Sequence, residues 1–284
     1  MNGELLRAPS CECQMCHGVV EPELVSVYPA SEVCLDCMEE SERRRLEQDL
    51  NQVQALDRSL LPALPRLRGL EVGLHYRPSR ILSGDFYDVR SEEDGGRLKL
   101  LLGDVMGKGI PAALLRTGLQ GALKALTAEV PSPARVLEKA NRYFSESAST
   151  ARLASVFYGT LDVDRGSLCF SNAGHLPPLV RKESGRWQTL DSTGVVLGAI
   201  DKAVYSERTV PLEPGDLFLL YSDGITEAQN RDGEFFDERR VTSIVDELHR
   251  SPVQEIASTI ADEVSRFAPG EPSDDRTLVV VRKA

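Results

Sequence analysis

Acidic residues at the ends of apolar runs constrain this chain more than any other feature of its sequence. Each lies at one end of a stretch that reads as a strand; they are Asp85, Asp104, Asp223 and the adjacent pair Asp274 and Asp275. A single aspartate in such a place is explained by a turn. Several in one domain are costly, because a buried carboxylate needs compensation and clustered carboxylates resist ionising together. A divalent cation removes both costs, and oxygen ligands favour Mg²⁺ or Mn²⁺ over zinc or copper.

Beyond residue 66 the chain alternates between strand and helix patterns. The patterns predict strands at Leu70–Tyr76, Ile81–Val89, Leu98–Val105, Leu153–Val163, Leu168–Asn172, Pro178–Lys182, Trp187–Leu190, Tyr205–Val210, Asp216–Tyr221 and Leu278–Arg282. They predict helices at Ala112–Glu129, Pro133–Ser147, Asp237–Leu248 and Val253–Phe267. Strands joined mostly by tight turns favour antiparallel sheets, and grouped helices favour a layered α+β domain over βαβ winding.

Three segments divide the chain. Residues 1–38 are rich in cysteine, residues 39–66 read as a helical linker, and residues 67–284 form the domain with the acidic strand ends. In the linker a heptad-like apolar stripe is interrupted by Asp57; its members are Leu46, Leu50, Val53 and Leu60. Two interpretations stay open: the stripe packs on the domain that follows, or it pairs with a second copy in a homodimer through residues 39–62.

The cysteines point to a second metal of another kind. Cys13 and Cys16 form one C-x2-C pair, Cys34 and Cys37 form another, and 17 residues separate the pairs. This spacing is typical of a zinc ribbon, in which four thiolates hold one structural Zn²⁺. A module of this size has little core, so the metal would largely fold it. Two nearby residues are spare donors, Cys11 and His17.

Five segments carry a family resemblance, and they occur in the order SGDFYDV, LLLGDVMGKGIPAALLR, NAGHLPPLV, LEPGDLFLLYSDGITEA and DDRTLVVVR. Together they resemble the SpoIIE-like branch of the PPM family of metal-dependent serine/threonine phosphatases, over about residues 60–284. The resemblance implies a layered αββα sandwich of two antiparallel sheets flanked by helices. It also implies hydrolysis of phosphoserine or phosphothreonine on a signalling protein, such as a STAS-type anti-sigma-factor antagonist.

The resemblance also implies roles for the acidic residues. Asp85 would bridge two Mn²⁺ or Mg²⁺ ions, and Asp104 would lie near the first ion with the carbonyl of Val105 as an added ligand. Asp223 and Asp274 would bind the second ion. Asp275 is adjacent and can exchange roles with Asp274. The catalytic set is therefore Asp85, Asp104, Asp223 and Asp274.

Further residues are expected to support this site. Asp88 is expected to help by hydrogen bonding, and three cations are candidates for gripping the substrate phosphate: Arg77, Arg80 and Lys108. A pair of cations of this kind activates water for attack on phosphorus. The alternative is a non-enzymatic regulatory or scaffold protein that uses a phosphatase-like domain to bind partners. The complete set of aspartates argues against it.

Charge and hydropathy exclude other classes of function. The formal net charge of −11 opposes binding to nucleic acid. No apolar run approaches the roughly 20 residues that a membrane helix needs, and the N-terminal residues lack the apolar core of a signal peptide. We therefore expect a cytoplasmic protein without a nucleic-acid or membrane partner.

Overall fold

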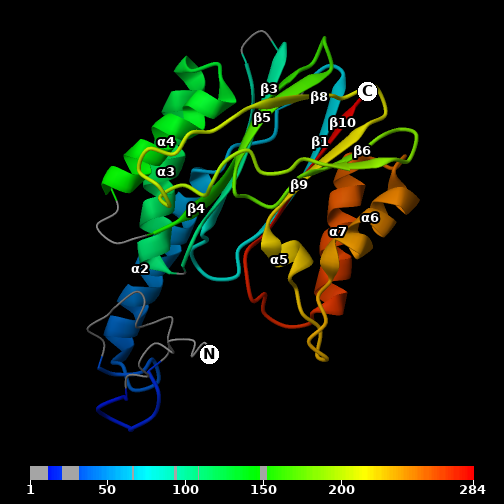
Figure 1. The fold of residues 1–284 in the computed structure, drawn as a ribbon. Coiled ribbons are helices and arrows are strands. Elements are labelled where there is room, and N and C mark those ends of the chain that lie inside the picture. The colour runs from blue at the N-terminus through cyan, green and yellow to red at the C-terminus, as the bar shows by residue number, and fades with distance from the viewer. Residues whose placement is uncertain (1–11, 21–31, 66, 93–94, 108, 148–151) are drawn as a thin grey trace, which may run out of the picture.

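The computed structural model describes residues 12–20, 32–65, 67–92, 95–107, 109–147 and 152–284 (Figure 1). Within these residues the strands form two antiparallel sheets. The first sheet has the order β1 (Leu70–Arg77), β10 (Arg276–Lys283), β9 (Leu217–Tyr221), β6 (Leu179–Arg181) and β7 (Trp187–Thr189). The second has the order β2 (Asp85–Ser91), β3 (Arg97–Val105), β4 (Ala154–Asp162), β5 (Ser167–Ala173) and β8 (Arg208–Pro211).

Helices cover the outer faces of both sheets. One pair, α3 (Ile110–Glu129) and α4 (Pro133–Ser147), lies on the second sheet, and the other pair, α6 (Asp237–Leu248) and α7 (Val253–Phe267), lies on the first (Figure 1). The apolar core between the sheets joins Phe157 of β4 to Phe218 of β9, with ring centroids 5.8 Å apart. The expected αββα sandwich is therefore confirmed.

Burial explains why the central strands carry continuous apolar runs. All of β9 is buried, and in β10 the residues from Arg276 to Val281 are buried. One face of these strands packs into the core between the sheets, and the other packs under α7 through residues such as Ile256 and Val280. A strand covered on both faces needs apolar residues at every position, so the chain can place polar groups only at the strand ends.

The expected elements agree with the observed ones except at their boundaries. The region after β9 differs most, because Asp223 begins a short helix, α5 (Asp223–Thr226), where no helix was expected. A four-residue helix has no apolar periodicity to reveal it. The last strand before β9 starts at Arg208 and not at Tyr205. No helix among the described residues has the length and apolar character needed to cross a membrane.

The linker helix α2 (Glu40–Ser59) contacts the cysteine-rich segment at one end and α3 at the other. Leu46 and Leu50 pack with Cys13 and Cys34. Farther along α2, the buried Asp57 forms an ion pair with the fully buried Arg116 of α3. The apolar stripe of the linker is therefore split in two. Its first residues, Leu46 and Leu50, pack on the cysteines, and farther along the helix Asp57 forms a buried ion pair.

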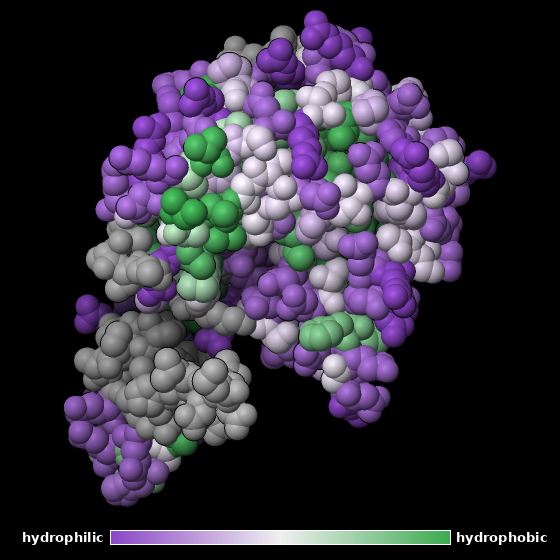
Figure 2. Space-filling view, viewed as in Figure 1, coloured by the Kyte–Doolittle hydropathy of each residue, from purple (hydrophilic) through white to green (hydrophobic). Residues whose placement is uncertain are grey.

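The rest of the α2 stripe stays at the surface. Val53, Leu56 and Leu60 are exposed and line an apolar groove of about 260 Å³ together with residues of α3 that include Leu114. Figure 2 shows hydrophobic residues reaching the surface on this side of the molecule, over α3 and α4.

Candidate metal centre

The antiparallel register of β2 and β3 places Asp85 directly opposite Asp104. Asp85 is 2% exposed, and its Oδ2 accepts a hydrogen bond of 2.6 Å from the hydroxyl of Thr277 on β10. Burial raises the pKa of Asp85 well above its usual value, and the negative charges of Asp104 and Asp275 raise it further. An ionised carboxylate in this place needs a cation.

Asp275 organises the segment that leads into β2. Its Oδ1 accepts hydrogen bonds from the amide and the hydroxyl of Ser79, at 2.6 and 2.9 Å. Its Oδ2 accepts from the Ser83 hydroxyl at 2.7 Å and from the Gly84 amide at 2.8 Å. Both carboxylate oxygens of this buried residue are therefore occupied by protein donors. The neighbouring Asp274 is only partly buried.

Close backbone packing brings Asp223 to the 274–275 pair. A methyl group added at Gly224 would lie 2.1 Å from the carbonyl oxygen of Asp275 and 3.1 Å from that of Asp274. Only glycine permits this approach of α5 to the chain before β10. The Ser222 hydroxyl also donates to the Asp275 carbonyl, at 3.1 Å. The structure thus brings the start of α5, which carries Asp223, against the Asp274–Asp275 pair.

Oxygen atoms converge beside Gly84 in a way that suits a hard cation. A methyl group added there would lie 3.0 Å from Oδ1 of Asp104 and 3.1 Å from the carbonyl oxygen of Val105. These oxygens can pack so close to the backbone only because residue 84 has no side chain. Carboxylate and carbonyl oxygens are the ligands that Mg²⁺ and Mn²⁺ prefer, so the residues present fit the ions that were expected.

An open cavity of about 480 Å³ adjoins this cluster. Asp104 and Asp223 line it, and so do polar and apolar residues from elsewhere in the chain that include Ser155, His175, Ser192 and Glu227. The cavity therefore places carboxylates of the cluster at the edge of a space large enough for part of a substrate.

The expected role of Asp88 is wrong. Its carboxylate pairs with Arg90 of the same strand, with Nε to Oδ1 at 2.7 Å, and it lies near Lys99 and Lys124. Asp88 is three residues from Asp85, and alternate residues of a strand point to opposite faces. Its carboxylate therefore faces away from the cluster.

The sequence did not single out Arg152 as a candidate for phosphate binding. Its Nη1 lies 3.2 Å from the position of a methyl group added at Gly107, in the loop that follows Asp104 and Val105. Of the cations expected to grip phosphate, Arg77 and Arg80 are exposed, and Lys108 lies outside the described residues.

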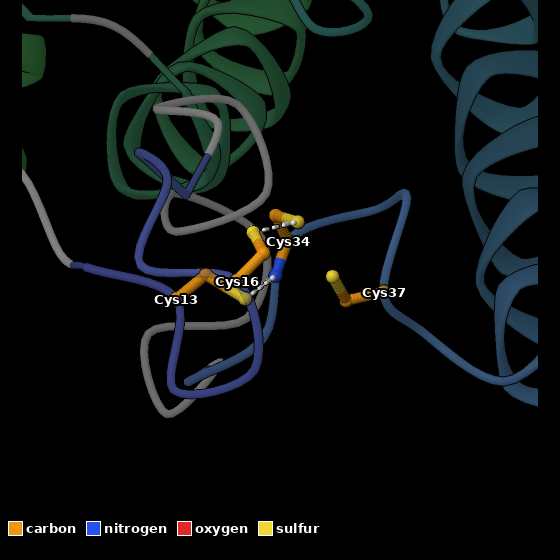
Figure 3. Close-up of side chains that lie close together, drawn as sticks. All are labelled: Cys13, Cys16, Cys34 and Cys37. Carbon is orange, nitrogen blue, oxygen red and sulfur yellow. Dashed lines mark hydrogen bonds between the residues drawn. The ribbon is translucent and has the colours of Figure 1, made fainter.

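The four expected cysteines lie together at the N-terminal end of the molecule (Figure 3). The sulfur atoms of Cys13, Cys16, Cys34 and Cys37 all lie within 4.8 Å of one another. The Sγ atoms of Cys16 and Cys34 are 3.7 Å apart, and four sulfurs around one tetrahedral zinc ion would be about 3.8 Å apart. Of the spare donors, His17 is exposed and contacts Glu12, and Cys11 lies outside the described residues.

Protonation of the thiols agrees with a metal site. The amide N–H of Cys34 donates to Sγ of Cys13 and lowers the pKa of Cys13 to about 6. Hydrogen bonding to Cys16 and Cys34 raises the pKa of Cys37 to about 12. Without a cation the four thiols cannot all ionise together, and a bound Zn²⁺ would allow it.

Solved structures share this fold. The SiaA-PP2C domain of Pseudomonas aeruginosa superposes with a TM-score of 0.74 at 22% identity, over 86% of this chain and 99% of that one. The PP2C phosphatase domain of SpoIIE from Bacillus subtilis, solved with a fragment of its regulatory domain, gives a TM-score of 0.65 at 21% identity, over 75% of this chain and 63% of that one. The fold is therefore that of the PP2C, or PPM, class of domains.

Sequence comparison places the chain within this class. Residues 94–284 match the family model described as Stage II sporulation protein E (SpoIIE), and the chain belongs to that family. It is 28% identical over 221 residues to the phosphoserine phosphatase RsbU of Bacillus subtilis, covering 78% of this chain and 65% of RsbU. It is 26% identical over 160 residues to RsbP of the same organism, another phosphoserine phosphatase, covering 55% of this chain and 40% of RsbP. The chain thus spans less than two thirds of these relatives.

Proposed function

We propose that this chain is a metal-dependent protein serine/threonine phosphatase. In this proposal Asp85 bridges two Mn²⁺ or Mg²⁺ ions. Asp104 and the Val105 carbonyl serve the first ion, and Asp223 and Asp274 serve the second. The observation that carries the proposal is the buried Asp85, which faces Asp104 across two strands and whose pKa is raised by burial and by the charges of Asp104 and Asp275.

The geometry favours Asp274 over Asp275 as the ligand. Both carboxylate oxygens of Asp275 accept hydrogen bonds from the 79–84 segment, so Asp275 serves to hold that segment beside Asp85. The Thr277 hydroxyl donates to the Asp85 carboxylate and orients it. Two hard cations in such a site supply Lewis acidity and activate water for attack on phosphorus. The adjoining cavity would receive the phosphorylated segment, and Arg152 would grip its phosphate.

The proposed substrate is phosphoserine or phosphothreonine on a signalling protein, in particular a STAS-type anti-sigma-factor antagonist. Two relatives, RsbU and RsbP, are phosphoserine phosphatases. One structural neighbour joins RsbU and RsbW domains in a single protein of Mycobacterium tuberculosis, at 24% identity. A cytoplasmic location agrees with the free thiols among the described cysteines, because that compartment keeps thiols reduced.

Phosphate release tests this function. With Mn²⁺, the wild-type protein should hydrolyse both an aryl phosphate and a phosphoserine protein at least about 100-fold faster than Asp104→Ala or Asp223→Ala. Loss of a residue that only supports a metal ligand typically lowers activity by about 10- to 100-fold, and loss of the ligand itself should lower it at least as much. Asp164→Ala, which removes an exposed carboxylate of a turn, is the matched control and should retain the wild-type rate. A wild-type rate no higher than those of the two ligand variants would instead favour the scaffold alternative.

We further propose the division of the chain into a zinc module (1–38), a linker (39–66) and a phosphatase domain (67–284). A homodimer through the 39–62 helix is part of this proposal, because Val53, Leu56 and Leu60 leave an apolar surface on α2. Sedimentation should then show a dimer that Leu56→Glu dissociates. A wild-type protein that sediments as a monomer would contradict the dimer.

The cysteine cluster is proposed to hold one structural Zn²⁺. Elemental analysis of the purified protein should find about one zinc per chain. Cys34→Ser should lose most of it, because a closed site needs all four ligands. Cys169→Ser, which changes a cysteine of β5 far from the cluster in sequence, should keep it. Equal zinc content in the two variants would rule out this site.

A further inference from the structure

His175 lies deep beside the proposed metal centre although it follows β5, far in sequence from every proposed ligand. The residue is 4% exposed and lines the cavity that Asp104 and Asp223 share. Asn172 holds its backbone on both sides. The Asn172 side chain accepts from the His175 amide at 2.8 Å and donates to the His175 carbonyl at 3.1 Å. The ring is therefore attached to a rigid turn.

On one side the ring reaches the sheet that carries Asp104. Nδ1 of His175 lies 2.9 Å from the hydroxyl of Ser155 on β4, and Ser155 is the direct cross-strand partner of Asp104. Burial lowers the pKa of His175 to about 4. The ring is therefore neutral near pH 7 and carries a hydrogen on one nitrogen only.

On the other side the ring faces the sheet that carries Asp223. The Tyr221 hydroxyl contacts the carbonyl of Pro177, two residues after His175, at 3.4 Å. Tyr221 lies two residues before Asp223. Among the described residues no group forms a hydrogen bond of normal geometry with Nε2, so the turn that carries His175 reaches this sheet through Pro177.

We propose that His175 is a positioning residue that sets the separation between Asp104 and Asp223, and through it the affinity of the metal centre. The inference rests on the proposed function. Between the sheets the core is apolar, and apolar contacts are not directional. Two carboxylates on opposite sheets would move apart in the absence of metal, because like charges repel. A buried ring that is hydrogen-bonded to Ser155, on a turn that contacts Tyr221 through Pro177, opposes that movement.

Direct measurement of Mn²⁺ binding, by calorimetry or by competition with a fluorescent chelator, tests this role without turnover. His175→Phe keeps the volume of the ring and removes both nitrogens, so its Kd for Mn²⁺ should rise roughly 10-fold or more, the range seen for outer-shell partners. Ser155→Ala should shift the Kd in the same direction. His175→Asn can still accept from Ser155 and should give an intermediate Kd. His249→Gln, at a partly exposed histidine in the turn after α6, should bind as the wild type does.

The thermal midpoint of each metal-free variant separates positioning from packing. The proposal requires a weaker Kd in His175→Phe while the metal-free midpoint stays within a few degrees of the wild type. It is overturned if His175→Phe binds Mn²⁺ with wild-type affinity. It is also overturned if, among the His175 and Ser155 variants, the affinity for Mn²⁺ falls only where the thermal midpoint of the metal-free protein falls too. A wild-type protein that binds no Mn²⁺ would instead refute the proposed function itself.

Discussion

Asp85→Asn should abolish Mn²⁺-dependent hydrolysis and at the same time stabilise the metal-free protein. Asparagine keeps the shape of the side chain, and its carbonyl oxygen can still accept from Thr277. It removes a buried charge whose acidic neighbours are Asp104 and Asp275. Relief of that repulsion should contribute on the order of 1 kcal/mol, which raises the Tm of a domain of this size by about 2–4 °C.

The two halves of this result need separate measurements. Activity should fall by more than about 100-fold, since the proposed bridging ligand is lost. Thermal unfolding in EDTA should show the higher Tm, and added Mn²⁺ should raise the Tm of the wild type but not of the variant. Asp88→Asn is the matched control, because it neutralises another carboxylate of β2 that pairs with Arg90 instead. Its Mn²⁺-induced rise in Tm should persist. A Mn²⁺-induced rise in Asp85→Asn would contradict the proposed bridging role.

The contrast between Asp85 and Asp88 also shows where sequence reasoning succeeded and failed. Asp85, Asp104 and Asp223 were found because a carboxylate at the end of an apolar run can be recognised from the sequence alone. The error at Asp88 was avoidable, since the alternation of side chains along a strand already separates residues 85 and 88. The family and the layered fold were predicted from ordered motifs and strand patterns, and the comparisons confirm both.

Other features had no signal in the sequence. Asp275 binds Ser79 from 196 positions away, and Thr277 reaches Asp85 across 192 positions. Such contacts depend on which strands become neighbours, and neither residue type nor spacing encodes that. The sequence alone could not tell which of the adjacent Asp274 and Asp275 is the metal ligand. The hydrogen bonds to the Asp275 carboxylate distinguish the two residues. His175 lies in the NAGHLPPLV segment that carries part of the family resemblance, but its place between two sheets appears only in three dimensions.

The interrupted stripe of α2 is a similar case. Asp57 looked like a flaw in a heptad pattern, yet it is 7% exposed and paired with Arg116, which is 0% exposed. Nη1 of Arg116 also lies 3.4 Å from Oε1 of Gln120, and the Gln120 amide donates to the Leu60 carbonyl at 3.3 Å. These polar contacts join the end of the linker to α3. The partner that explains Asp57 lies 59 positions away.

Removal of one member of this buried pair should be the most destabilising single change outside the metal centre. Asp57→Ala leaves a guanidinium with no solvent exposure and without its paired carboxylate, and loss of one partner of a buried pair typically costs about 3–5 kcal/mol. The double variant Asp57→Leu/Arg116→Met should recover most of this loss, because apolar replacement of both partners removes the desolvation cost together with the attraction.

Denaturant unfolding of Asp57→Leu, Arg116→Met and the double variant, each compared with the wild type, gives the coupling energy directly. Hydrogen exchange shows where the structure is weakened. In Asp57→Ala the α2 amides near residue 57 should exchange faster. The amides of β9 and β10 should still exchange only through global unfolding. A double variant that is far less destabilised than the sum of the two single losses would mean that the pair acts as a unit that fastens the linker to α3. Additive effects of Asp57→Leu and Arg116→Met would show that each residue stabilises the fold independently, and α2 would then be held to the domain by Gln120 and apolar contact.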